Sequence, residues 1–182
     1  MAPLDLALLN IGPLCQETAK EAFSSGNPIV DEYYRQEAIS DMTSGYARTF
    51  VANHQNHSGL CGFYTIKLHM FTSKAHDSYI KKAFNTSPAR CNSKSDNSHI
   101  LGYYLRCIGV SEGIQNQSIG SFLLQDAISK IESCHQLTGG QFVAVMAGHD
   151  DPATRERLLS FYTAFGFLSC TDTGTLLLRK IN

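Results

Sequence analysis

The stretch from Tyr103 to Ile131 constrains the fold more than any other part of the chain. It opens on an apolar run rich in β-forming residues, Tyr103–Val110, which predicts a buried strand. A short polar segment follows, and then apolar residues recur at i, i+1, i+4, i+5 and i+8, at Leu123, Leu124, Ala127, Ile128 and Ile131. That spacing predicts an amphipathic helix. A strand joined directly to a helix is a building unit of α/β proteins.

The polar segment Gln115–Gly120 must turn the chain from the strand end to the helix start within about six residues. Several backbone N–H groups there have no intrahelical partner, and the aligned peptide dipoles add partial positive charge. Such a turn can hold a pyrophosphate. It can equally be an ordinary connection in which Ser118 caps the helix, and the six residues alone leave both interpretations open.

Length and composition favour a single domain over residues 1–182, because a chain of this length can bury most of its apolar surface in one core. No apolar run is long enough to span a membrane, and no basic residue precedes the apolar part of the amino terminus. We therefore expect a cytoplasmic protein that is neither secreted nor embedded in a membrane.

Cysteine and histidine usage gives no sign of a metal site. The six cysteines are scattered without a C-x-x-C pair, which is typical of reduced thiols, and the seven histidines are dispersed as well. His54 and His57 fall in a polar turn, where we expect them to be solvated. We expect no bound metal.

Positive charge is concentrated in one part of the chain. Lys67–Lys94 holds six basic residues and one acidic residue, a net charge of +5, whereas the rest of the chain holds nine basic and fifteen acidic residues, a net charge of −6. Local positive charge attracts phosphate backbones, although a solvated loop explains it as well. The polar segment Phe71–His99 is also long, and such segments in compact domains are usually functional or disordered.

Before the central strand, the pattern predicts two helices and three strands. Asn27-Pro28 is a strong helix start, with Asn as N-cap and Pro at the first helical position, and Gly45 ends that helix. Gly62 indicates a bulge within its strand. The other expected elements are a strand over Leu4–Ile11, a short helix over Gln16–Phe23, and an antiparallel pair of strands over Ala47–Ala52 and Leu60–Met70.

After the central helix, Gln141–Met146 predicts a further buried strand, parallel to the central one because a helix connects them. Asp150-Asp151-Pro152 starts the last helix and Gly166 ends it. Phe167–Thr171 and Thr175–Ile181 follow as a hairpin. The element order is β-α-α-β-β-β-α-β-α-β-β, which predicts a mixed sheet.

Two motifs within this order resemble the GNAT superfamily of acyl-CoA-dependent N-acyltransferases. The turn Gln115-Asn116-Gln117-Ser118-Ile119-Gly120 is similar to the family's pyrophosphate loop, Q/R-x-x-G-x-G/A, and Leu159-Ser160-Phe161-Tyr162-Thr163-Ala164-Phe165-Gly166-Phe167 resembles its FY-x-x-x-GF helix end. The resemblance covers essentially the whole chain. It implies the GNAT fold, an α/β (α+β) architecture whose mixed central sheet has about six or seven strands and helices on both faces.

Within the superfamily, Phe23-Ser24-Ser25-Gly26-Asn27-Pro28, Ser44-Gly45-Tyr46-Ala47-Arg48-Thr49-Phe50-Val51 and Gly62-Phe63-Tyr64 are similar to GNAT toxins of type II toxin–antitoxin modules. The resemblance implies an enzyme that acetylates the free α-amine of aminoacyl-tRNA from acetyl-CoA and so blocks translation. It also implies a homodimer and a DNA-binding antitoxin as partner. The chain departs from the pattern at Asn116 and Ser118, where the loop usually has glycine, and in being slightly acidic where the toxins tend to be basic.

The resemblance also assigns roles to residues. Main-chain groups of Ile108 and Val110 would pair with the pantetheine arm, and the amides of Gln115, Asn116, Gln117, Ser118, Ile119 and Gly120 would hold the pyrophosphate. Tyr162 would be the general acid, because a phenol with a pKa of about 10 stays protonated near neutral pH and can donate to the departing thiolate. The candidates for contacts with tRNA phosphates are Arg48, Lys81, Lys82 and Arg90.

The acceptor and its base stay open. An α-amine titrates near a pKa of about 8 and needs no dedicated base, whereas a lysine side chain would need one. Glu37, Asp41 and Glu112 are possible bases, although such residues more often lie on a solvated face. A GNAT enzyme of this kind can instead acetylate a small-molecule amine or a protein amino terminus. Asn116 and Ser118 are also compatible with a degenerate GNAT that binds CoA or a partner protein without turnover.

Overall fold

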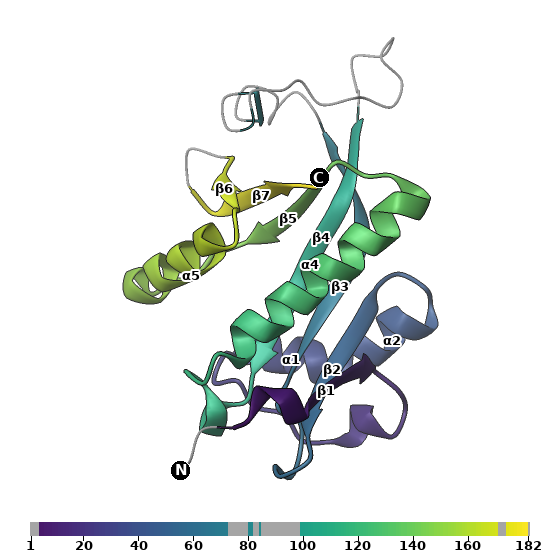
Figure 1. The fold of residues 1–182 in the computed structure, drawn as a ribbon, viewed down its shortest axis with the longest axis vertical. Coiled ribbons are helices and arrows are strands. Elements are labelled where there is room, and N and C mark those ends of the chain that lie inside the picture. The colour runs from purple at the N-terminus through teal and green to yellow at the C-terminus, as the bar shows by residue number, and fades with distance from the viewer. Residues whose placement is uncertain (1–3, 73–79, 82–83, 85–98, 171–173, 182) are drawn as a thin grey trace. The chain divides into compact units, whose positions relative to one another are not determined.

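The computed structural model describes residues 4–72, 80–81, 84, 99–170 and 174–181. The strands are β1 (Leu9–Pro13), β2 (Arg48–His54), β3 (Gly62–Thr72), β4 (His99–Val110), β5 (Phe142–Met146), β6 (Leu168–Ser169) and β7 (Leu176–Lys180). The α-helices are α1 (Pro28–Gln36), α2 (Ala38–Thr43), α4 (Ile119–Thr138) and α5 (Pro152–Ala164) (Figure 1). The strands and the helices α4 and α5 follow the predicted order, whereas α1 and α2 together take the place of the second predicted helix.

The strands form one seven-stranded sheet in the order β1-β2-β3-β4-β5-β7-β6, which agrees with the predicted number. The chain divides into two compact units. Unit 1 comprises Met1–Lys67 and Leu105–Ser129, and unit 2 comprises Leu68–Tyr104 and Lys130–Asn182. Strands β3 and β4 and helix α4 contribute residues to both.

In unit 1, β2 pairs antiparallel with both β1 and β3, as expected for the predicted hairpin. Thr49 lies opposite Thr65, and their buried hydroxyls are 2.8 Å apart. Gly62 lies opposite Ala52 in a regular register, so the predicted bulge is wrong. A Cβ at Gly62 would lie 2.6 Å from the carbonyl oxygen of Gly109, and close approach of the β4 backbone is therefore the reason for this glycine.

Helix α1 starts as the sequence predicts. The Asn27 side chain accepts hydrogen bonds from the amides of Ile29 and Val30, and Pro28 occupies the first helical position. The single predicted helix is instead two, because the φ of −110° at Glu37 departs from the helical value, and this residue ends α1 and precedes α2. The apolar residues Val30, Tyr34, Ala38 and Met42, spaced four residues apart, pack with Phe63 in one core cluster.

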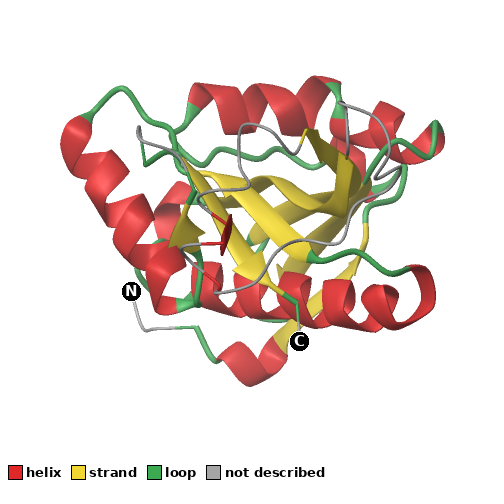
Figure 2. Ribbon diagram, turned by 90° about the horizontal axis from the view of Figure 1, so that it is seen from above, coloured by secondary structure: helices red, strands yellow, loops and turns green. Residues whose placement is uncertain are grey.

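Helices α1 and α4 cover opposite faces of β3 within unit 1. Phe63 packs against Tyr34 of α1, with ring centroids 4.9 Å apart. Its neighbour Tyr64 donates a hydrogen bond to Asp126 of α4. Successive side chains of a strand point to opposite faces, so this alternation places one helix on each side. Figure 2 shows helices on both sides of the strands.

Unit 2 is built around β5, which pairs antiparallel with β7. The predicted hairpin is confirmed by the pairing of Leu168 in β6 with Leu178 in β7. A core cluster gathers side chains from four strands, from the connection between β3 and β4 and from the residue that follows β6, namely Phe71, Ile80, Ile100, Phe142, Ala144, Cys170 and Leu178. Helix α5 begins at the predicted cap, where the Asp151 carboxylate accepts from the Thr154 amide at 2.8 Å.

The amino-terminal predictions need correction. Leu6–Leu8 forms a 3-10 turn capped by Asp5, so the expected strand over Leu4–Ile11 begins only at Leu9. The expected helix over Gln16–Phe23 is reduced to one 3-10 turn, because the Thr18 hydroxyl bonds the main chain of Cys15 and competes with helical hydrogen bonding. His54 is 5% exposed and its Nε2 lies 2.9 Å from the carbonyl oxygen of Asp5, so it is not solvated.

Within the described ranges, no helix is both long and apolar enough to cross a membrane. The same residues contain no group of three His, Cys, Asp or Glu side chains that could hold a metal ion.

Candidate functional site

The segment between β4 and α4 has an unusual backbone. A 3-10 turn over Glu112–Ile114 follows β4, and residues 115–120, which we call the cofactor loop, lead into α4. Asn116 and Ser118 both have φ of 63°, in the left-handed region that favours glycine. The two departures from the glycine motif therefore fall on the two residues whose backbone conformation suits glycine.

The cofactor loop presents a row of unused hydrogen-bond donors. Among the hydrogen bonds of the described residues, none uses the amide N–H of any residue from Asn116 to Gly120. The Ser118 carbonyl accepts from the Phe122 amide at 3.0 Å, but the positive φ of Ser118 is not the extended backbone of an ordinary N-cap. Free amides at the start of a 20-residue helix, reinforced by its dipole, suit an anionic group.

The two glutamines of the cofactor loop are bonded through their side chains. Gln115 Nε2 donates to the carbonyl oxygens of Ser25 at 2.8 Å and Val110 at 3.1 Å. Gln117 Oε1 accepts from the amide of Leu4 at 2.8 Å. The Val110 carbonyl, predicted to pair with pantetheine, thus already accepts one hydrogen bond. Sequence analysis missed Leu4 and Ser25, and only the Ser24-Ser25-Gly26 part of the toxin-like motif pointed to the second.

Tyr162 lies in unit 2, near the end of α5, and is 3% exposed. Its ring contacts those of Phe161 and Phe167, with centroids 5.1 and 5.7 Å away. The Tyr162 carbonyl accepts from the amides of Phe165 and Phe167, on either side of Gly166, whose φ is 80°. The FY-x-x-x-GF pattern therefore builds a helix end that fixes the backbone and ring of this tyrosine.

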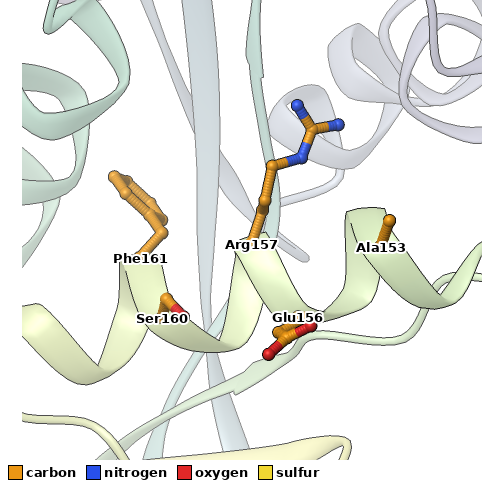
Figure 3. A pocket seen from close by; sticks show the side chains of 5 residues that line it. All are labelled: Ala153, Glu156, Arg157, Ser160 and Phe161. Carbon is orange, nitrogen blue, oxygen red and sulfur yellow. The ribbon is translucent and has the colours of Figure 1, made fainter.

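An open hollow of ≈ 700 Å³ lies against α5. Figure 3 shows Ala153, Arg157 and Phe161 on one side of the helix, four residues apart, with Glu156 and Ser160 on the adjacent side. None of the predicted site residues is among these five lining residues.

The carboxylates considered as bases are engaged with other groups. Arg106 contacts Glu37 at 2.6 Å and Asp41 at 3.8 Å, and its guanidinium lies over the Tyr33 ring. The Tyr33 hydroxyl donates to Asp41 at 3.0 Å. Burial raises the pKa of Tyr33 to about 12.

The third carboxylate, Glu112, accepts from the Ser24 hydroxyl at 3.0 Å. None of the three is a solvated face residue without partners, so the structure does not single out any of them as a base.

The candidates for phosphate contacts are only partly described. Arg48 begins β2, is exposed, and donates from Nη1 to the Met42 carbonyl at 2.9 Å. Lys81 is exposed in unit 2. Lys82 and Arg90 lie outside the described residues, as does most of the basic segment. Ile108, the other predicted pantetheine contact, lies within β4 and is partly buried.

Comparison with known proteins identifies similar chains, although no protein-family profile matches the sequence. A curated protein of Mycobacterium tuberculosis, described as a tRNA-acetylating toxin, is 30% identical over 158 residues, which is 86% of this chain and 83% of the relative.

Two solved structures have a similar fold. AtaT complexed with acetyl-methionyl-tRNAfMet has a TM-score of 0.74 at 16% identity, covering 94% of each chain. A tyrosine-to-phenylalanine mutant of AtaT, bound to the C-terminus of the antitoxin AtaR and to acetyl-CoA, has a TM-score of 0.70 at 14% identity, covering 96% of this chain and 94% of that one. These likenesses confirm the predicted GNAT fold.

Proposed function

This chain belongs to the family of tRNA-acetylating toxins, and we propose that it transfers the acetyl group of acetyl-CoA to the α-amine of an aminoacyl-tRNA and thereby blocks translation. The structural observation that supports this most directly is the row of unused amides from Asn116 to Gly120 at the start of α4. A pyrophosphate is the part of acetyl-CoA that such a row would bind.

The residues of the cofactor loop fit acetyl-CoA, which supplies the acyl group as a thioester when it is bound. The amides from Asn116 to Gly120 bind the pyrophosphate, and main-chain groups of Ile108 and Val110 align the pantetheine arm. Tyr162 donates its phenolic proton to the sulfur when the C–S bond breaks and the C–N bond to the acceptor amine forms, and the proton that the acceptor nitrogen then loses restores the phenol, directly or through water. Because an α-amine has a pKa of about 8, a substantial fraction is neutral near pH 7 and can attack without a dedicated base.

The family supports the proposed acceptor and partners. Arg48 and the basic segment Lys67–Lys94, including Lys81, Lys82 and Arg90, supply the positive charge that an RNA backbone requires. A DNA-binding antitoxin neutralises the toxin in the cytoplasm, as AtaR pairs with AtaT. The active form is a homodimer, and sedimentation of the purified protein checks this.

A labelling experiment tests the proposed function. The protein is incubated with isotopically labelled acetyl-CoA and a pool of aminoacyl-tRNA, and the aminoacyl adenosines released by nuclease are analysed by mass spectrometry. We expect labelled acetyl on the α-amine of one or a few amino acids, together with acetyl-CoA-dependent arrest of a cell-free translation extract. Label on small amines or protein amino termini alone would favour another GNAT enzyme. Calorimetric binding of acetyl-CoA without thiol release would identify a degenerate one.

A further inference from the structure

Gln115 and Gln117 make side-chain contacts that fasten the cofactor loop at two points. We propose that both are positioning residues, which hold the loop in the shape that binds acetyl-CoA while their side chains do not contact it. The inference rests on the proposed function, since it concerns how the same loop is prepared for its ligand. It assigns the side chains of Gln115 and Gln117 a role different from direct contact with the pyrophosphate.

The polarity of the two contacts is fixed by their main-chain partners. The carbonyl oxygens of Ser25 and Val110 can only accept, so the Gln115 side chain must donate from its amide nitrogen. The amide of Leu4 can only donate, so Gln117 must accept with its amide oxygen. Gln115 therefore uses the nitrogen of its side-chain amide, whereas Gln117, two positions later, uses the oxygen.

Residues with bonded side chains alternate along the loop with residues whose backbone is left-handed. Gln115 and Gln117 are bonded to main-chain groups outside the loop, whereas Asn116 and Ser118 are exposed and left-handed. A left-handed backbone is unfavourable for residues with a Cβ, so Asn116 and Ser118 would relax toward other conformations if the loop were free. Fastening the residues beside them restrains the loop before the ligand arrives, which lowers the cost of binding.

The anchor for Gln115 is itself held by a network at the start of α1. Both the amide and the hydroxyl of Ser25 donate to Asp31 Oδ1, at 2.7 and 2.6 Å. At the neighbouring Ser24, the carbonyl oxygen accepts a hydrogen bond from the Glu112 amide at 3.0 Å. The Ser24 hydroxyl donates a hydrogen bond to the Glu112 carboxylate. These hydrogen bonds hold the Ser25 carbonyl in place within unit 1. Its hydrogen bond with Gln115 therefore restrains the cofactor loop.

Matched substitutions can test the two contacts separately, because Gln115 is a hydrogen-bond donor and Gln117 is an acceptor. Gln115→Met and Gln117→Met keep side-chain size and remove the hydrogen bonds at both positions. Gln115→Glu removes the donor, whereas Gln117→Glu keeps an acceptor, and both add the same charge to the same loop. Gln125→Met, at an exposed position of α4, controls for the loss of a glutamine amide.

We expect both Met variants and Gln115→Glu to raise the KM and the calorimetric Kd for acetyl-CoA about five- to ten-fold, the effect of one hydrogen bond. The kcat should stay within two-fold of wild type. Gln117→Glu should lose less affinity than Gln115→Glu because it keeps its acceptor, and Gln125→Met should bind within two-fold of wild type, measured at high salt to reduce the effect of the added charge. Thermal unfolding identifies any variant whose effect comes from a lost fold.

The outcomes separate this inference from the proposed function. Equal Kd for wild type and both Met variants would overturn the positioning role while leaving the acetyltransferase intact. An equal loss in Gln115→Glu and Gln117→Glu would overturn the assigned polarity. A wild-type protein that binds no acetyl-CoA would instead remove the proposed function.

Discussion

The phenol of Tyr64 on β3 donates a hydrogen bond to the carboxylate of Asp126 on α4. Tyr64 is fully buried, and burial raises its pKa well above the ordinary value for tyrosine. A hydrogen bond to a charged group is stronger than one between neutral groups. This pair therefore fixes the position of α4 over β3, immediately after the cofactor loop.

Replacing Tyr64 with Phe should lower the free energy of unfolding by about 1.5–3 kcal/mol, because Asp126 loses a charge-assisted hydrogen bond. Tyr46→Phe is the control, since Tyr46 is 55% exposed and the hydrogen bond that its hydroxyl accepts from Lys67 lies at the surface, so its substitution should change stability by less than about 0.5 kcal/mol. Urea denaturation measures both variants. Equal stability of the two would show that the Tyr64 hydroxyl contributes little.

Gly62→Ala should be severely destabilising, by about 1–3 kcal/mol or more, because the new Cβ would meet the β4 backbone. A backbone atom cannot move aside as a flexible side chain can. Gly12→Ala in β1 is the matched control, since no atom lies within 4 Å of its added Cβ. Comparable melting temperatures for the two variants would contradict the close approach of β3 and β4.

Ser118→Gly should stabilise the protein by about 0.5–1 kcal/mol, because glycine relieves the left-handed strain of this residue. Ser118→Ala keeps the Cβ and loses only the hydroxyl, so it should not gain stability. Chemical denaturation compares the two with wild type. A gain for both variants would point to the hydroxyl as the source of strain and not the backbone.

Tyr162→Phe should reduce kcat for acetyl transfer by about 10²- to 10⁴-fold, the usual contribution of a general acid, with little change in the KM for acetyl-CoA. Tyr103→Phe is the comparison in the same unit. Its buried hydroxyl donates to the Gly139 carbonyl at 2.9 Å, so its loss should lower stability and leave kcat unchanged. Wild-type kcat in Tyr162→Phe would remove this phenol from the chemistry.

Stability should fall at high pH because of Tyr33 and Tyr34. Burial raises the pKa of each to about 12, whereas an unfolded tyrosine has a pKa of about 10. Between these two values both tyrosines stay protonated in the folded protein but ionise in the unfolded chain. Their contribution to the free energy of unfolding is therefore complete below about pH 10 and is lost between about pH 10 and 12. Tyr34→Phe should flatten this decline, measured by denaturation between pH 9 and 11. Parallel curves for wild type and variant would contradict the raised pKa values.

Local patterns predicted several helix boundaries well. The cap at Asn27-Pro28, the cap at Asp151 and the stop at Gly166 each follow from short-range chemistry, and all three were confirmed. The patterns failed where contacts between distant residues decide. A glycine within a strand suggested a bulge at Gly62. The real reason for this glycine is the Gly109 backbone beside it in space, which is distant in the sequence and therefore invisible to a local pattern.

The cofactor loop shows the same limit. Its location and its likeness to a phosphate-binding loop are visible in six consecutive residues. The partners of Gln115 and Gln117 are not, because Ser25 and Leu4 lie 90 and 113 positions away. The roles of Glu37 and Asp41 likewise depend on Arg106, a strand residue that no helical pattern brings to them.

Ile80 is 1% exposed in the core of unit 2, and the Phe84 ring lies 5.3 Å from that of Phe142. The connection between β3 and β4 is therefore pinned partway along its length. The entropic cost of closing a loop depends on the number of residues between its fixed points, so this connection behaves as two shorter closures.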